Sequence, residues 1–268
     1  MEHDLVLIRG IMSSSLHWWD FLPMMKTQFP KSQIFTPDIL GNGLHFEMAT
    51  PAKLEHNILG LRKQVPSSKK KIIIGFSLGG MFAIEWALKH TEEVEAIILI
   101  NTSLSGTSLF KRFAPRSFFK ILLSGMSKDL RKREESILRL TTKLKQEQLP
   151  QIAEVFMSIE KKHPTKTTNF FRQLYIATKV SLKNNMPSVP ILILNSEKDQ
   201  IVNPECSHKI SKTWNIPVVA HPTAGHDLTL DDPQWVAEQI QNWLIAQKLF
   251  KFPTNKITEI QAHTQELL

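Results

Sequence analysis

Short apolar runs alternate along the chain with longer stretches in which apolar residues recur at helical spacing. Six of the runs are rich in Val and Ile and are bounded by Gly, Pro, Asn or Ser, which is typical of buried strands. These runs are Leu5 to Arg9, Gln33 to Pro37, Lys71 to Gly75, Val94 to Asn101, Ile191 to Asn195 and Pro217 to Ala220. The alternation predicts an α/β fold with a mostly parallel sheet.

Five helical stretches lie between these strands or follow the last of them. They are Trp18 to Gln28, Pro51 to Gln64, Leu78 to His90, Pro204 to Thr213 and Pro233 to Gln247. Parallel strands need a crossover connection, which is usually a helix, so these stretches should cover both faces of the sheet.

The alternation stops after Asn101 and resumes at Pro190, and the sequence between them has only helical periodicity. Three groups of apolar residues fall at helical spacing: Phe119, Leu122, Leu123 and Met126; Leu130, Ile137, Leu140 and Leu144; Ile152, Val155, Phe156 and Ile159. We therefore expect an all-helical cap over residues 104–186, inserted into an α/β core formed by residues 1–103 and 187–268. The tail at 250–268 is amphipathic, and the pattern does not indicate where it docks.

The predicted cap carries the positive charge of the chain. Residues 104–186 have a formal charge of +11, whereas the remainder has −3 and the whole chain has +8. Basic residues begin the segment and recur on its second helical run: Lys111, Arg112, Arg116, Arg131, Lys132, Arg133, Arg139 and Lys143. This asymmetry favours a surface that meets an acidic partner, with an ordinary solvated helical surface as the alternative.

Composition narrows the class of protein further. With 268 residues, of which 42% are hydrophobic and 22% charged, the chain has the composition of a globular protein. Its single cysteine, Cys206, excludes an intramolecular disulfide and a Cys-based zinc site and fits a cytoplasmic location. The N-terminal apolar run is too short for a signal peptide, and no run is long enough for a transmembrane segment.

The motif GFSLGG at residues 75–80 follows an apolar strand and begins a helical pattern. In this context Gly75 and Gly79 allow a tight strand-to-helix turn, on which Ser77 stands exposed. The helix that begins at Leu78 directs free backbone N–H groups and its positive dipole end toward the same point. This arrangement suits a nucleophilic serine and the oxyanion that its attack creates.

A serine hydroxyl needs a base to accept its proton, and the base needs a carboxylate to orient it. Asp199 follows the predicted strand ILILN, and His226 follows the strand PVVA. Both would lie at carboxyl ends of parallel strands, where α/β sheets build their sites.

Together, GFSLGG, the segment D-x-x-V-x-P that begins at Asp199 and the loop AGHD around His226 resemble the α/β-hydrolase family over nearly the whole chain. DILGNG at residues 38–43 is similar to the family's D-x-P-G-x-G loop, with Leu40 in place of Pro. The resemblance implies a catalytic triad of Ser77, Asp199 and His226, in the chain order of this family, and an oxyanion hole formed by the backbone N–H groups of Leu78 and Ile11.

This sequence departs from the family pattern at three further places. Arg9-Gly10 stands where relatives usually have His-Gly, and the usual hairpin before the first strand is absent. Asn101 ends the fourth predicted strand, where some relatives keep their acid, and an amide cannot replace a carboxylate. Asp199 is therefore the expected acid.

We expect a serine hydrolase that cleaves a carboxylic ester or thioester through an acyl-enzyme, with no metal or organic cofactor and no nucleic-acid partner. Phe76, Met12 and Trp18 are the expected substrate-binding residues. Four alternatives remain open. They are lyase or carbon–carbon bond chemistry on the same triad, a non-enzymatic binding protein on the same scaffold, a surface-bound lipase whose cap presents apolar faces beside its lysines, and action on esters held by an acidic acyl carrier protein that the basic cap would bind.

Overall fold

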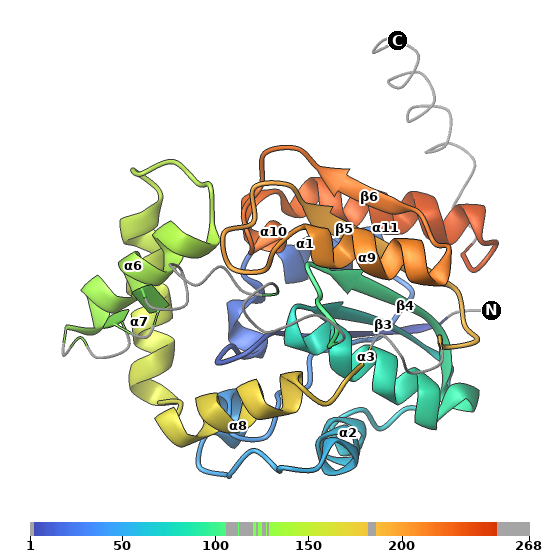
Figure 1. The fold of residues 1–268 in the computed structure, drawn as a ribbon, viewed down its shortest axis with the longest axis horizontal. Helices are drawn as coiled ribbons and strands as arrows, with labels where there is room; N and C mark the ends of the chain where they lie inside the picture. Colours follow the sequence, from blue (N-terminus) through green and yellow to red (C-terminus); the bar gives the residue numbers. More distant parts are fainter. Residues whose placement is uncertain are drawn as a thin grey trace, which may run out of the picture.

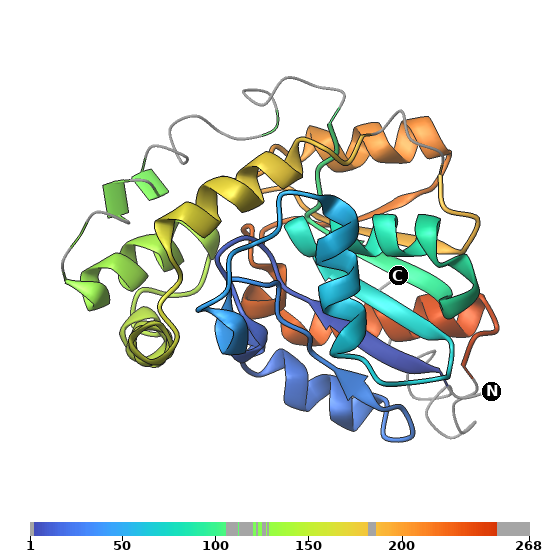
Figure 2. The same ribbon diagram turned by 90° about the horizontal axis from the view of Figure 1, so that it is seen from below.

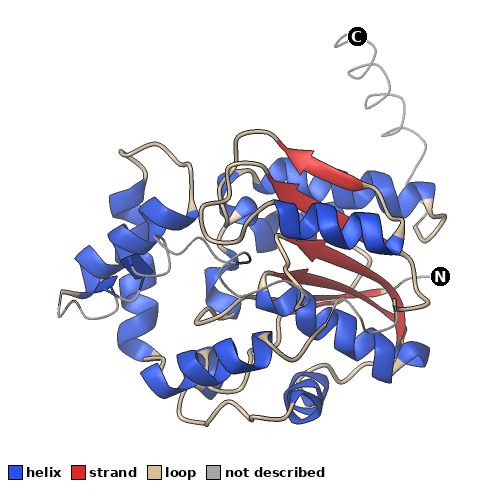
Figure 3. Ribbon diagram, viewed as in Figure 1, coloured by secondary structure: helices blue, strands red, loops and turns tan. Residues whose placement is uncertain are grey.

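In a computed structural model of the chain, six parallel strands form one sheet at the centre of the molecule (Figures 1 and 3). The structure describes residues 3–105, 112, 120–121, 123–124, 127, 129–181 and 186–250. The strands are β1 (Asp4–Ile8), β2 (Ile34–Phe35), β3 (Lys71–Phe76), β4 (Val94–Ile100), β5 (Ile191–Ser196) and β6 (Val218–His221), in the order β2-β1-β3-β4-β5-β6. This arrangement confirms the predicted α/β fold with a parallel sheet.

Successive side chains of the central strands enter two separate hydrophobic cores, because neighbouring residues of a strand face opposite sides of a sheet. In β4, Ile97 and Leu99 belong to one core, and Ile98 and Ile100 belong to the other. Burial on both faces explains why these strands are continuous apolar runs rather than alternating ones.

Helices cover both faces, as expected. Helices α2 (Leu54–Lys63), α3 (Leu78–Lys89) and α9 (Glu205–Trp214) pack on one face, and α1 (Phe21–Gln28) and α11 (Pro233–Ala246) pack on the other. The first helix was expected to begin at Trp18, and this boundary is wrong. Residues Ser15–Trp18 form the short 3-10 helix η1, and Trp19 has a positive φ of 45°, which interrupts the helix before α1.

Helices α6 (Leu130–Thr141), α7 (Leu149–Lys162) and α8 (Thr167–Ala177) lie beyond the carboxyl ends of the strands (Figures 1 and 2). Helices α6 and α7 pack through a small core of their own, which also receives Leu230 of α10 (Leu228–Asp231). The structure therefore has a helical layer above the edge of the sheet where Ser77 lies. Short 3-10 helices also occur at Gly43–His45 (η2) and Thr91–Glu93 (η3).

Several expectations fall wholly or partly outside the described residues. The helix around Phe119 to Met126 is described only at residues 120–121 and 123–124, and Lys111, Arg116 and the tail from residue 251 onward are not described. In the described part of the chain, no helix combines the length and apolar character needed to cross a membrane.

Candidate active site

The register of the sheet brings the GFSLGG turn next to the loop that follows β1. Ile8 lies opposite Gly75, so the chain beyond β1 runs beside Ser77. A Cβ atom added to Gly10 would lie 3.1 Å from the Ser77 Cβ, and one added to Gly79 would lie 2.1 Å from the Ile8 carbonyl oxygen. The contact at Gly79 is with backbone, which cannot move aside cheaply, so glycine is required there.

Ser77 itself occupies a strained position between β3 and α3. Its φ of 54° and ψ of −116° are unusual for a residue with a side chain. The Ser77 N–H donates to the Ile100 carbonyl at 2.8 Å, and the Thr102 hydroxyl donates to the Ser77 carbonyl at 3.2 Å. These bonds to the end of β4 hold the turn that the sequence predicted.

Asp199 and His226 meet although 27 residues separate them. The His226 Nδ1 and the Asp199 Oδ2 are 2.7 Å apart, and both side chains are buried. The other carboxylate oxygen accepts hydrogen bonds from the backbone N–H groups of Ile201 at 2.8 Å and Val202 at 3.0 Å. With Nδ1 donating to the carboxylate, a neutral His226 ring leaves Nε2 free to accept a proton.

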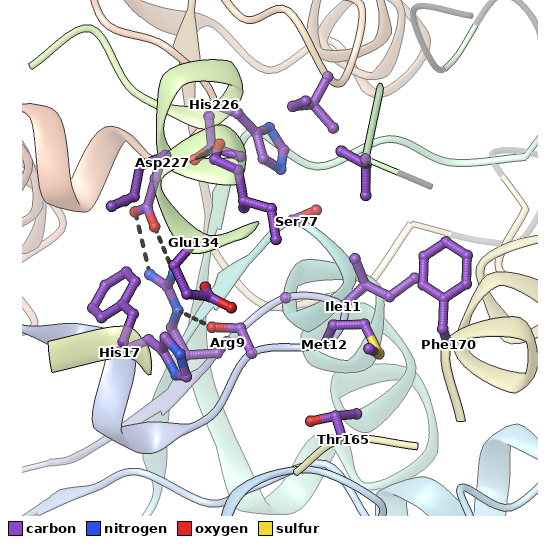
Figure 4. A pocket seen from close by; sticks show the side chains of 18 of the residues that line it. Arg9, Ile11, Met12, His17, Ser77, Glu134, Thr165, Phe170, His226 and Asp227 are labelled. Carbon is purple, nitrogen blue, oxygen red and sulfur yellow. Dashed lines mark hydrogen bonds and ion pairs between the residues drawn. The ribbon is translucent and has the colours of Figure 1, made fainter. Parts of the chain in front are cut away.

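Ser77 and His226 both line a pocket of about 350 Å³ (Figure 4). Its floor comes from the loops that follow the strands, and its roof comes from α6, α7 and α8. Phe76 and Met12, both expected to bind substrate, line it as well, together with Ile11. Most of the lining is apolar, as in sites for small organic molecules.

A second, smaller cavity adjoins Ser77 and is here called the recess. It has a volume of about 20 Å³, and Ile11, Ser77 and Leu78 are among the residues that line it. A cavity of this size holds about one oxygen-sized group. The two residues expected to supply the oxyanion hole therefore border the same small space as the serine.

A model of the alpha/beta hydrolase fold matches residues 5–233. The chain belongs to the α/β-hydrolase family. No curated protein matches its sequence significantly.

Solved structures of the α/β-hydrolase fold superpose on most of the chain. An esterase from Thermogutta terrifontis shares 19% identity and has a TM-score of 0.68, with 91% of this chain and 90% of that chain covered. An esterase from Rhodococcus sp. ECU1013 shares 18% identity with a TM-score of 0.67 and the same coverage. A meta-cleavage product hydrolase from Pseudomonas fluorescens IP01 shares 15% identity with a TM-score of 0.71 and 92% coverage of both chains. At these identities the likeness establishes the shared fold.

Arg9, which replaces the usual histidine of α/β-hydrolases, forms a buried ion pair with Asp227. The Arg9 guanidinium donates to the two Asp227 carboxylate oxygens at 3.2 and 2.6 Å, and to the Thr229 hydroxyl at 3.1 Å. Its Nε also donates to the Ser13 hydroxyl at 3.1 Å. The pair thus ties the loop after β1 to the loop that carries His226.

Trp18 does not line the pocket among the described residues, so its assignment as a substrate-binding residue is wrong. Its side chain is 1% exposed, and the Arg9 guanidinium lies 4.9 Å from the centre of its ring. Arg9 also lies 4.6 Å from the centre of the Phe76 ring. Trp18 therefore packs against the Arg9 guanidinium in a cation–π contact and does not contact a ligand in the pocket.

We expect Asp227→Asn to lower the free energy of unfolding by about 3 kcal/mol near neutral pH, because it leaves the Arg9 charge buried without its partner. Burial alone would raise the pKa of the Asp227 carboxyl, but the Arg9 charge and the hydrogen bonds from Arg9 and Thr229 hold it below its usual value. The stabilisation is therefore complete above about pH 4 and is lost as the pH falls through the lowered pKa.

Urea unfolding of wild type and Asp227→Asn at a series of pH values measures this difference. The exposed Asp20, changed to Asn, is the matched control and should leave stability nearly unchanged. A deficit in Asp227→Asn that stays constant from neutral to acid pH would contradict the ion-pair explanation.

His17 lines the pocket although its sequence context gave no sign of a site. Burial, with the nearby Arg9 charge, lowers the pKa of its ring to about 3, so the ring is neutral at physiological pH. Its Nδ1 accepts from the Ser14 N–H at 3.1 Å, which places the ring proton on Nε2. The Phe156 ring of α7 packs edge-on against the His17 ring, with the two ring centres 4.6 Å apart.

Asn101 makes side-chain contacts that position the loop of His226 and that the sequence did not predict. Its side-chain amide donates to the His226 carbonyl at 2.6 Å and to the Ser196 hydroxyl at 2.9 Å, and its side-chain oxygen accepts from the Ser196 N–H at 2.8 Å. The residue that occupies the alternative acid position of some relatives therefore fastens the histidine loop to the end of β5.

One group in the described part of the chain has the spacing for a metal ion. Side-chain atoms of His90, Glu92 and Glu93 lie within 4.8 Å of one another. The group precedes β4, at the opposite edge of the sheet from Ser77, and Glu93 already accepts hydrogen bonds from Arg62 and Trp86. It has no connection with the pocket.

Proposed function

We propose that this α/β-hydrolase cleaves a carboxylic ester or thioester through a covalent acyl-enzyme on Ser77. The observation that carries the proposal is that His226, which lines the same pocket as Ser77, makes a buried 2.7 Å contact with Asp199. Nucleophile, base and orienting acid are the three groups that this chemistry needs. The esterase structures that share the fold are consistent with it.

In the proposed reaction the Ser77 hydroxyl oxygen attacks the acyl carbon while its proton passes to the His226 Nε2. The Asp199 carboxylate stabilises the imidazolium, and the backbone N–H groups of Ile11 and Leu78 stabilise the oxyanion in the recess. His226 then protonates the leaving alcohol or thiol. Water attacks the acyl-enzyme, with His226 as base, and releases the acid and free Ser77.

Hydrolysis of p-nitrophenyl esters of graded acyl length tests the substrate class. The same panel includes thioesters and a substrate of the meta-cleavage type, in which a carbon–carbon bond would be cleaved. We expect turnover of esters or thioesters, with a preference for the chain that fills the apolar pocket. Turnover of the carbon–carbon substrate alone would favour the alternative chemistry. Binding without turnover of any substrate would favour a binding protein.

We further propose that α8 acts as part of a cap that positions the oxyanion loop. Gln173 of α8 is fully buried, and its side-chain oxygen accepts from the Met12 N–H at 2.9 Å. Its amide donates to the Asn42 side chain at 2.7 Å, and Asn42 in turn donates to the Ser13 carbonyl at 2.9 Å. This ring of bonds holds Met12 at a φ of 57°, directly after Ile11.

Gln173→Leu should lower kcat by about tenfold to a hundredfold and change KM less, because the N–H group of Ile11 then shifts away from the oxyanion. Tyr175→Leu is the matched control, since Tyr175 lies on the same helix with its side chain half-exposed. Steady-state kinetics on the best ester measures both constants. Equal kcat values in the two variants would show that the bonds of Gln173 only stabilise the fold.

The carrier-protein alternative rests on the basic surface of α6, which is less basic than its sequence indicates. Arg133 turns inward to contact Glu160 and Glu134, and Arg131 and Arg139 both lie beside Glu135. Lys132 also lies beside a carboxylate, that of Asp129 at 3.6 Å, but its side chain is 81% exposed and remains accessible to an acidic partner. A carrier-bound ester in the same panel tests this, since salt should reduce any advantage over the free ester.

A further inference from the structure

Glu134 of α6 brings a carboxylate into an otherwise apolar part of the pocket. The residue is 8% exposed and lines the pocket on the same side as Arg9 and His17 in Figure 4. One of its oxygens accepts a hydrogen bond from the Arg133 Nε at 3.2 Å. Among the described residues, its second oxygen has no hydrogen-bond donor. This oxygen is not one of the fully enclosed polar atoms that lack a partner, so it is open to the pocket, where it can accept a hydrogen bond from a ligand.

The charges around Glu134 do not balance. The Arg133 guanidinium also lies 2.8 Å from the Glu160 carboxylate, so one cation faces two carboxylates. Among the described lining residues, the other guanidinium belongs to Arg9, which is engaged by Asp227. His17 is neutral. When Glu134 is ionised, the described lining residues therefore carry one negative charge in excess.

Burial raises the pKa of the Glu134 carboxyl, and the Arg133 charge opposes this shift. An ionised Glu134 attracts a cation that donates a hydrogen bond, and a cation in turn favours the ionised form by lowering that pKa. A carboxylate at the same point would add a second buried negative charge.

We propose that Glu134 selects esters whose chain ends in a protonated amine, with the ammonium group donating to the free Glu134 oxygen. The proposal rests on the esterase function proposed above and names the substrate class for it. The apolar residues of the pocket would contact the hydrocarbon chain of the substrate, which joins the reacting carbonyl at Ser77 to the cationic end.

The test uses p-nitrophenyl esters with straight acyl chains of graded length that end in a dimethylammonium, an isopropyl or a carboxylate group. Dimethylammonium and isopropyl have nearly the same shape, so their kcat/KM ratio isolates the charge and its hydrogen bond. At the best length we expect the ammonium ester to be preferred by about tenfold or more over the isopropyl ester, and the carboxylate ester to be the poorest.

Glu134→Gln should bring the ratio of ammonium to isopropyl ester close to one. Glu135→Gln is the matched control, because Glu135 is the next residue of α6 and pairs with Arg131 and Arg139 instead of lining the pocket. It should keep the ratio of the wild type. Because each ratio is taken within one variant, a loss of folded enzyme cancels out.

Two outcomes would overturn the inference while leaving the esterase function intact. One is equal kcat/KM for the ammonium and isopropyl esters in the wild type, or preference for the carboxylate ester. The other is an ammonium preference that Glu134→Gln does not reduce. Failure to hydrolyse any of the esters would instead overturn the esterase function on which the inference rests.

Discussion

Ser77→Ala is expected to lower kcat for ester hydrolysis by about 10⁶-fold, the largest effect of any single substitution in this protein. In the proposed mechanism, alanine removes the oxygen that would form the acyl-enzyme and leaves only the smaller rate enhancement expected from the recess and from substrate binding. The substitution should not unfold the protein, because the elbow is held by backbone groups of Ser77 and by the glycines around it.

Steady-state kinetics with a circular-dichroism spectrum of each variant measures the effect. Ser207→Ala is the matched control, since Ser207 is a serine that lies on α9, outside the described pocket. It should retain nearly full activity. A Ser77→Ala enzyme that keeps activity within about tenfold of wild type would remove Ser77 from the reaction.

Asp199→Asn is expected to lower kcat by about 10⁴-fold with a smaller change in KM. The carboxylate accepts the Nδ1 proton of His226 and so keeps Nε2 free for the proton of Ser77. An amide at this position can donate to Nδ1, which would move the ring proton to Nε2 and block the base. The backbone bonds from Ile201 and Val202 would still hold the side-chain oxygen, so the loop should keep its shape.

Glu197→Gln is the control for Asp199→Asn, because Glu197 is the neighbouring carboxylate on the same loop and contacts His208 rather than His226. Its kcat should stay close to that of wild type. A decrease in kcat of the same size in both variants would mean that general damage to the loop, and not the tautomer of His226, accounts for the loss.

The sequence predicted those features that depend on neighbouring residues. Apolar runs such as Lys71 to Gly75 identified the strands, because each strand is buried on both faces. The turn at Ser77 was recognisable because the glycines that permit it lie within two or three residues. The proximity of Asp199 and His226 follows from their positions after strands, since all parallel strands end at one edge of the sheet.

Features that depend on distant partners could not be predicted in this way. Arg9 pairs with Asp227, which is 218 positions away, and its guanidinium lies over the Trp18 ring. The sequence does not show this arrangement, which keeps Trp18 out of the described pocket lining. Arg133 resembled the other basic residues of its helix, although it turns inward to Glu160. Its orientation follows from the packing of α6 against α7, which periodicity alone does not specify.

The covalent acyl-enzyme on Ser77 is the central claim, and labelling with a fluorophosphonate probe tests it most directly. The probe reacts with a serine that a neighbouring base has activated, so digestion and mass spectrometry should find one modified peptide, with the phosphonyl group on Ser77. Ser77→Ala should abolish the label, and Asp199→Asn should slow its formation. A label on another residue, or one that persists in Ser77→Ala, would contradict the proposed mechanism.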